Sequence, residues 1–220
     1  MAATRHEPAT ERVSPMRGDV AALARQLGDA AGWTPDATDL LAPAQLPQTV
    51  AAFRAFLSDY RQRVLVAREL PAIARAFEHA RRGELRELLV LDKELSDVPV
   101  PDEFKRASEA VGRRQLHKLR PMRDHRLVQR YIAAVDEGHA HAWHALLFGV
   151  TLAVYSLPLR QGLLHFAQQT VLGFIHSAAP RLGLRNGKLA ALASEACEGL
   201  PTATNEALAG VAPVAAALSR

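Results

Sequence analysis

The stretch GHAHAWHALLFGVTLAVYSLPLRQGLLHFAQQTVLGFIHSAAP, residues 138–180, decides the fold. Its only Asp, Glu, Lys or Arg is Arg160, whereas charged residues occur throughout the rest of the chain. A helix that is apolar nearly all round is buried, either in a bundle or in a membrane. We therefore expect this stretch to form the core, as two helices divided by Pro158.

A membrane location for this core fails on length and on polarity. The apolar part, residues 145–154, is shorter than the ~20 residues needed to span a bilayer. Hydrocarbon penalises polar side chains, and the segment after the proline contains Gln161, His165, Gln168, Gln169 and His176. Apolar residues in 159–179 recur every three or four positions, which predicts a helical hairpin inside a soluble bundle.

Length and composition place the chain among single-domain globular proteins. It has 220 residues, 49% of them hydrophobic, and a net charge of +4 from 27 basic and 23 acidic residues. This mild excess does not by itself demand nucleic acid. The single cysteine excludes a disulfide framework. The N-terminus lacks the apolar segment of a secretory signal, so we expect a cytoplasmic protein.

Helical spacing recurs along most of the chain, and no segment shows sustained alternation of the kind that strands require. The expected helices cover residues 17–31, 49–66, 69–82, 84–95, 101–119, 126–137, 143–157, 159–179, 188–197 and 202–218. The sequence thus predicts an all-α, single-domain bundle of roughly eight to ten helices around a central apolar hairpin. Three regions are expected: a variable, partly disordered segment 1–45, the helical domain 46–200 and an Ala-rich C-terminal helix 201–220.

Five histidines of the core stretch are the first candidates for chemistry. His139, His141 and His144 are two and three residues apart, so they cannot share one helix face; His165 and His176 follow in the next helix. Neither an H-E-x-x-H motif nor Cys/His spacing accompanies them. We therefore prefer surface or core histidines to metal ligands. Because no nucleophile–base pair and no paired carboxylates occur either, we expect no enzyme.

Residues 102–130 carry nine Lys or Arg against four acids. Nucleic-acid binding through this face is the alternative function. Its only aromatic residues, Phe104 and Tyr131, stand at the ends of the run, which leaves no platform on which bases could stack. A solvated face, or an interface for an acidic protein, is the preferred interpretation.

The segment RLGLRNGK, residues 181–188, joins two expected helices. Two glycines indicate an exposed turn, and Arg181, Arg185 and Lys188 give it three positive charges with no acid between them. A glycine-bearing loop before a helix can bind an anion. This one lacks P-loop spacing and follows a helix rather than a strand, so a nucleotide site is not expected.

Several short strings follow one another across about 46–195. They are Glu69-Leu70-Pro71, Arg75-Ala76, Leu91-Asp92, Ala107-Ser108 with Gly112-Arg113, Phe148-Gly149, Ser177-Ala178-Ala179 and residues 182–188. Their order resembles the urease accessory protein F (UreF) family, which tends to show E-L-P, R-A, L-D, A-S-x-x-x-G-R, F-G, S-A-A and a loop like P-L-G-Q-x-D-G-Q.

The chain departs from the family pattern at three places. Both glutamines of the loop are replaced, by Leu184 and Lys188, and Asn186 stands for the Asp. The Gly- and Ser-rich opening of the family has no counterpart in residues 1–45. The family's H-E-x-x-Y-S-R-L-F-like tail is missing after the Ala-rich residues 201–220.

The resemblance implies a non-enzymatic, dimer-forming helical chaperone that bridges UreD (or UreH) and the GTPase UreG during nickel delivery to the urease apoprotein. Nickel and GTP would be handled by these partners, so no cofactor, metal site, nucleic acid or membrane is expected for this chain. The expected partner-binding surface is the 181–188 loop together with two arginines of the basic run that we expect to lie nearby in space. Its residues are Arg113, Arg114, Arg181, Gly183, Arg185, Asn186, Gly187 and Lys188.

Overall fold

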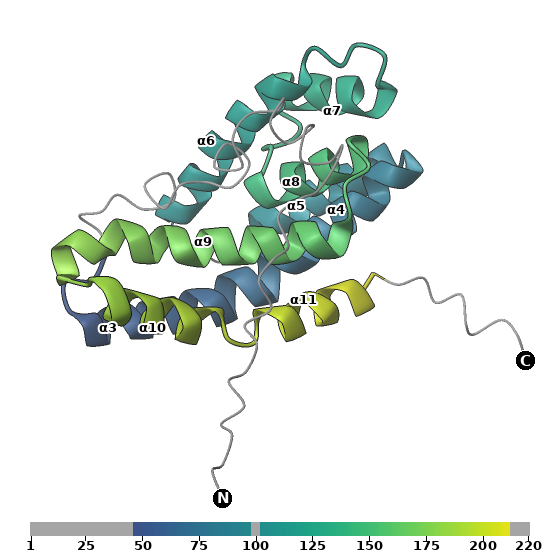
Figure 1. Cartoon of the computed structure of the whole chain (residues 1–220). Coiled ribbons are helices and arrows are strands. Elements are labelled where there is room, and N and C mark those ends of the chain that lie inside the picture. The colour runs from purple at the N-terminus through teal and green to yellow at the C-terminus, as the bar shows by residue number, and fades with distance from the viewer. Residues whose placement is uncertain (1–45, 98–101, 212–220) are drawn as a thin grey trace, which may run out of the picture.

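The computed structural model describes residues 46–97 and 102–211, and this part of the chain contains helices and no strand, as expected (Figure 1). The expected helix at 17–31, the expected disorder within 1–45 and the last residues of the Ala-rich helix lie outside the described residues. The elements in order are α3 (Val50–Tyr60), the π-helix η3 (Arg61–Glu69), α4 (Leu70–Arg82), α5 (Leu85–Asp97), α6 (Asp102–Leu119), α7 (Arg126–Asp136), α8 (His144–Val154), α9 (Leu159–Leu182), α10 (Asn186–Cys197) and α11 (Leu200–Ala209).

The first described helix is longer than expected. Helices were predicted over 49–66 and 69–82, with Pro71 in the first turn of the second, but α3, η3 and α4 form one continuous helix. At its middle the N–H of Leu70 donates to the carbonyl of Leu65, five residues back. A proline inside a helix clashes with the carbonyl four residues earlier, and a wider π turn before it gives that carbonyl room. The expected boundary between two helices at residues 66–69 is therefore wrong, because a single helix runs through it.

Helix α8 is the centre of the bundle. Eight of its eleven residues are buried, and it packs most extensively against α4 and next against α6, with a smaller contact to α9. The predicted apolar core is therefore confirmed, but its closest pair is α4–α8 rather than an α8–α9 hairpin. The reason is Gly149, where an added Cβ would lie 2.3 Å from the carbonyl oxygen of Ile73. The absent side chain lets the two backbones approach.

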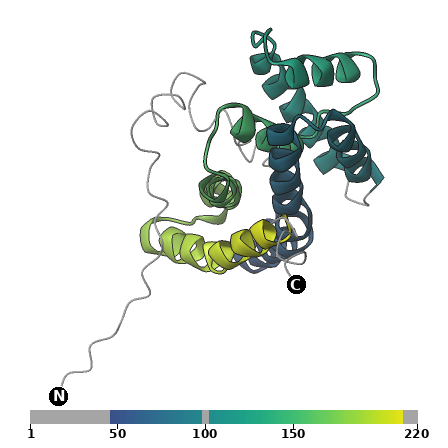
Figure 2. The ribbon, with the colours of Figure 1, turned by 90° about the vertical axis from the view of Figure 1, so that its right-hand side faces the viewer.

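Helix α9 organises a second layer with α3, α10 and α11. Figure 2 shows α9 next to α10 and α11 in the lower part of the molecule, with α6 and α7 in its upper part. Phe148 of α8 and Phe174 of α9 are both buried, as predicted. Helix α9 continues past Pro180 and ends at Gly183, whose φ is 62°. None of the helices in the described part combines the length and apolar character needed to cross a membrane.

We predict that Gly149→Ala lowers the free energy of unfolding by about 2 kcal/mol or more, because the added methyl group meets backbone rather than a movable side chain. The control is Gly187→Ala, since a Cβ there has no neighbour within 4 Å and alanine is the better helix former. Urea denaturation of both variants measures the effect. Equal stability of the two variants would contradict the close α4–α8 packing.

Candidate functional site

The 181–188 segment is an exposed turn, as predicted. Helix α9 ends with the N–H of Leu184 donating to the carbonyl of Ala179 over 3.0 Å, and the side chain of Leu184 is buried beneath the turn. This αL cap with a hydrophobic contact fixes the direction of the chain. The remaining predicted site residues here are all exposed: Arg181, Gly183, Arg185, Asn186, Gly187 and Lys188.

Helix α10 begins earlier than expected, and this shortens the loop. It starts at Asn186 rather than at Lys188, and the N–H of Lys188 donates to the carbonyl of Arg185 over 3.2 Å. Asn186 adopts a φ of 45°, a left-handed conformation that asparagine tolerates better than most residues. Arg185 and Lys188 therefore lie at the start of a helix, where hydrogen bonds fix their backbone positions.

Arg113 and Arg114 are exposed on α6, in a different part of the molecule. Figures 1 and 2 both show the α9–α10 turn and the C-terminal half of α6 apart. The expectation that these arginines lie beside the loop is therefore wrong. The cause is packing: α6 buries Val111 and Leu116 and contacts α8, whereas α10 contacts α9 and α3.

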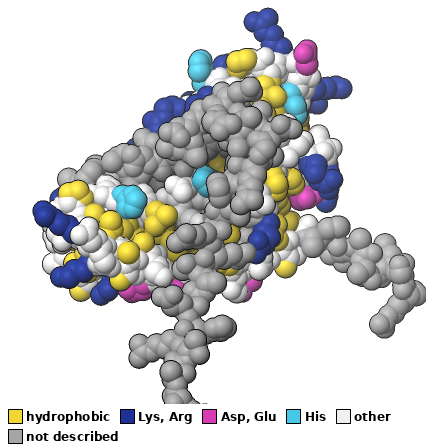
Figure 3. All heavy atoms as spheres, in the orientation of Figure 1, with side chains coloured by type: hydrophobic (Ala, Val, Ile, Leu, Met, Phe, Trp, Pro, Cys, Tyr) yellow, Lys and Arg dark blue, Asp and Glu magenta, His cyan; other side chains and the backbone are white. Residues whose placement is uncertain are grey.

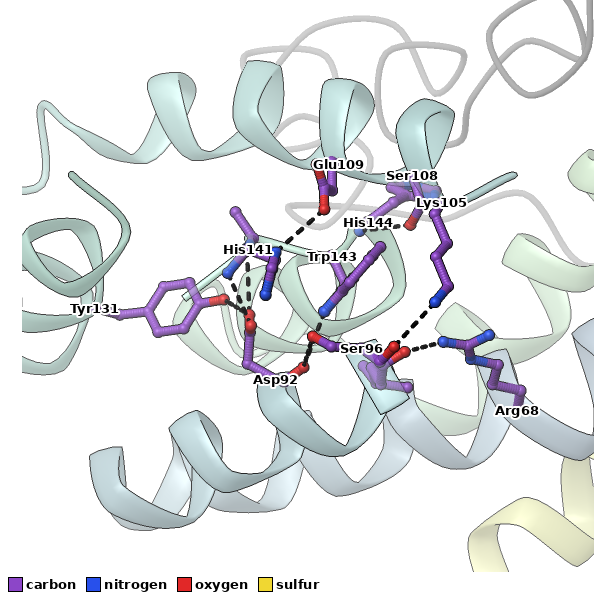
Figure 4. Close-up of polar contacts among 12 residues, drawn as sticks. Arg68, Asp92, Ser96, Lys105, Ser108, Glu109, Tyr131, His141, Trp143 and His144 are labelled. Atoms are coloured by element: carbon purple, nitrogen blue, oxygen red, sulfur yellow. Dashed lines mark hydrogen bonds and ion pairs between the residues drawn. The ribbon is translucent and has the colours of Figure 1, made fainter. Parts of the chain in front are cut away.

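A buried carboxylate at Asp92 of α5 is the main polar feature that the sequence reasoning missed (Figure 4). Asp92 is 1% exposed. Its carboxylate accepts hydrogen bonds from the Tyr131 hydroxyl at 2.6 Å, from the His141 N–H at 2.8 Å and from the Ala142 N–H at 3.2 Å. Its backbone carbonyl accepts from the Trp143 indole N–H at 2.9 Å. Three donors to one carboxylate offset the cost of burying its charge.

Residues of α6 also form hydrogen bonds with the segment between α7 and α8. The Ser108 hydroxyl accepts from the His144 N–H at 3.1 Å, and Glu109 bonds the His141 ring at 3.1 Å. A Cβ at Gly112 would lie only 1.7 Å from the carbonyl oxygen of Ala142, so only glycine permits this approach of α6. Two of the strings that suggested the family resemblance, L-D and A-S-x-x-x-G-R, therefore meet at this segment.

The sequence does contain a signal for this anchor. Asp92 lies within the apolar stripe of α5 formed by Leu88, Leu91 and Leu95, all of which are buried. An acid on the buried face of an amphipathic helix requires partners. Its partners could not be found from the sequence, because they come from residues about 40 to 50 positions away.

The histidines of this region have separate surroundings rather than a common centre. His144 is buried beside the rings of Phe148 and Phe166, while His139 is exposed near Glu137. Within residues 46–97 and 102–211 no group of three or more His, Cys, Asp or Glu side chains is arranged to hold a metal ion. The expectation that the chain carries no metal or cofactor of its own stays a prediction.

A second polar group surrounds the C-terminal end of α5. Arg68 donates to the carbonyl of Leu95, and Lys105 donates to the carbonyl of Ser96 over 3.0 Å. Cations suit this position because the carbonyl end of a helix is partly negative. Arg68, Leu95 and Lys105 line a small cavity together with Glu69. The Glu69 carboxylate accepts a hydrogen bond from the Tyr60 hydroxyl at 2.9 Å. Burial raises the pKa of Glu69 to about 7, although the Tyr60 hydrogen bond and the Arg68 charge act in the opposite direction.

These features define an all-helical protein with cations exposed on its helices and a buried carboxylate, Asp92, held by hydrogen bonds. A family model for UreF matches residues 48–185, more than half of the chain. The chain therefore belongs to the UreF family of urease accessory proteins, which confirms the resemblance found in its sequence. This is an accessory family and not a catalytic one. A comparison with curated proteins gives no match.

We predict that the stability of the protein falls as the pH rises from about 5 to 8 in a way that depends on Glu69. Its pKa is about 7 in the folded state, against 4.5 for an ordinary glutamate. The folded state therefore keeps a proton that the unfolded state releases, and this stabilisation is lost when Glu69 ionises. Glu69→Gln should remove about 2 kcal/mol of this loss, because the amide is neutral at every pH and can still accept from Tyr60.

Urea denaturation at pH 5.5 and pH 8 measures this difference for wild type and variant. Glu87→Gln is the control, because the Glu87 side chain is exposed. An unchanged pH dependence in Glu69→Gln would show that the carboxyl of Glu69 is already ionised at pH 5.5.

Proposed function

We propose that the protein is a scaffold in the insertion of nickel into urease, bridging UreD or UreH and the GTPase UreG. The observation that carries this proposal is the UreF family match over residues 48–185. The geometry supports it, because exposed cations on a helical bundle are suited to binding acidic surfaces of other proteins. Nickel and GTP are handled by the partners, and the chain acts in the cytoplasm as a homodimer.

The mechanism is surface complementarity. The α9–α10 turn presents Arg181, Arg185 and Lys188 from a capped helix end and a helix start, so little conformational freedom is lost on binding. An acidic face of the GTPase binds there and is held in a state suited to nickel transfer. The two family glutamines are replaced by Leu184 and Lys188, and the second replacement adds a positive charge to the turn.

The alternative of nucleic-acid binding through residues 102–130 gains no support. Its two aromatic residues are both committed to the interior: Phe104 stacks on Tyr60 with ring centroids 5.7 Å apart, and Tyr131 is 1% exposed and bonded to Asp92. Neither ring is available to stack on a base.

We predict that the double variant Arg185→Glu, Lys188→Glu no longer co-elutes with UreG on size-exclusion chromatography, because both cations become acids at the turn. The fold should persist, since exposed substitutions usually change stability by about 0.5 kcal/mol or less. The control is Arg63→Glu, Arg86→Glu, which changes the charge equally at two exposed arginines on other elements.

Complex formation by the reversed variant at the wild-type level would exclude the turn as the docking site. If the wild-type protein bound UreG neither alone nor together with UreD or UreH, and failed to support urease activation, the scaffold function itself would be wrong.

A further inference from the structure

The small cavity at the C-terminal end of α5 combines charged and apolar walls. Its volume is about 40 Å³, which is room for about three water molecules. Residues of η3, α5, α6 and the start of α8 meet around it, although they are far apart in the sequence. Its polar lining consists of Arg68, Glu69, Lys105 and Ser108, and most of the remainder is apolar or aromatic.

The π-helix η3 brings two neighbouring residues to this cavity. Arg68 and Glu69 both line it, together with Val64. In an α-helix, residues five apart point about 140° away from each other around the axis. The five-residue hydrogen bonds of a π-helix bring such residues towards one side instead, and π-helical turns are frequent at functional sites.

Hydrogen-bond donors are abundant in the cavity. Figure 4 shows Arg68 and Lys105 approaching the end of α5 from different helices, where each donates to one backbone carbonyl. A guanidinium and an ammonium carry several N–H donors each and no acceptor. The Ser108 hydroxyl accepts from the His144 N–H and still has its own proton to donate. A cavity in which donors prevail over acceptors suits an anion.

Glu69 is the one acid among the described residues that line the cavity. Burial raises its pKa to about 7, so it is mostly neutral below pH 7. A neutral carboxyl is itself a donor. The Tyr60 hydroxyl next to it also stays neutral, because burial raises its pKa well above the usual value. With Arg68 and Lys105 charged, the cavity is positive below pH 7.

The exposed cations of the molecule offer an anion less than this cavity does. On the face drawn in Figure 3, Lys and Arg side chains lie in separate groups at the surface, where water and salt screen their charge. Arg68 and Lys105 are half-buried and lie beside the rings of Phe104 and Trp143 in the cavity wall. Charges in such surroundings are screened less.

We propose that this cavity binds one small monovalent carboxylate, no larger than acetate, through Arg68, Lys105 and the neutral carboxyl of Glu69. The planar guanidinium matches the two oxygens of a carboxylate, and the ammonium adds a second positive charge. The cavity volume of about 40 Å³ leaves no room for a larger acid. This site belongs to the chain alone and does not depend on the scaffold function proposed above.

Tryptophan fluorescence can detect the bound anion, because Trp143 lines the cavity. The chain has two tryptophans, so Trp33→Phe in the full chain leaves Trp143 as the only source of the signal. Sodium acetate replaces sodium chloride at constant ionic strength and pH 6. We expect a saturable change with a dissociation constant on the order of 1 mM, as suits so small a ligand. Sulfate, which is tetrahedral and doubly charged, should give no saturable change.

Two variants in this background locate the site. Lys105→Met removes a cation, and Ala145→Val fills the cavity without changing any charge, because Ala145 lines it. Each should weaken acetate binding at least about tenfold. The control is Lys93→Met, which removes the charge of an exposed lysine on α5 and should bind acetate like the parent. Circular dichroism verifies that all three are folded.

The pH dependence of binding tests the part of Glu69. A carboxyl with a pKa near 7 is only about one-tenth protonated at pH 8, so acetate should bind about tenfold more weakly at pH 8 than at pH 6. In Glu69→Gln the amide is neutral at both pH values, and the two affinities should be equal.

Three outcomes would overturn the inference. The first is the absence of a saturable change with acetate, or an equal change with sulfate. The second is acetate binding that persists in both Lys105→Met and Ala145→Val, because the anion would then lie elsewhere. The third is equal affinity of the parent at pH 6 and pH 8, because Glu69 would then take no part. All three leave the proposed scaffold function standing, since no partner protein enters the experiment.

Discussion

The rest of the structure depends on the buried carboxylate of Asp92. Burying an ionised carboxylate without partners would cost more free energy than the net stability of a typical domain. Hydrogen bonds from Tyr131, His141 and Ala142 offset that cost, and they fix α5, α7 and the segment before α8 to one another. Because α8 is the helix on which α4 and α6 pack, this single group sets the relation between the two sides of the bundle.

The anchor also determines where the exposed charges lie. Ala142 adopts a φ of 63°, which is costly for a non-glycine residue and persists only when its surroundings enforce it. Its carbonyl then lies against Gly112, so α6 is held at one depth and one rotation. The contacts of Ser108 and Gly112 with the segment before α8 thus fix the backbone from which α6 presents its cations.

Local patterns predicted the all-helical class, the burial of Phe148 and Phe174 and the exposure of the α9–α10 turn, because each depends on residues near one another in sequence. The α4–α8 contact, the π-helical middle of the first helix and the partners of Asp92 were not predicted, because each depends on residues brought together only by folding. The same limit explains the wrong placement of Arg113 and Arg114 beside the turn: charge pattern shows that a residue is exposed, whereas only packing shows on which side.

The most direct test of this account is the stability of Asp92→Asn. The amide offers one acceptor oxygen where the carboxylate offers two, and its NH₂ group would face a backbone N–H. We therefore predict a loss of about 2–4 kcal/mol in urea denaturation, together with faster hydrogen exchange at the amides of His141 and Ala142. Unchanged stability and unchanged exchange at these two amides would contradict the claim that Asp92 anchors the fold.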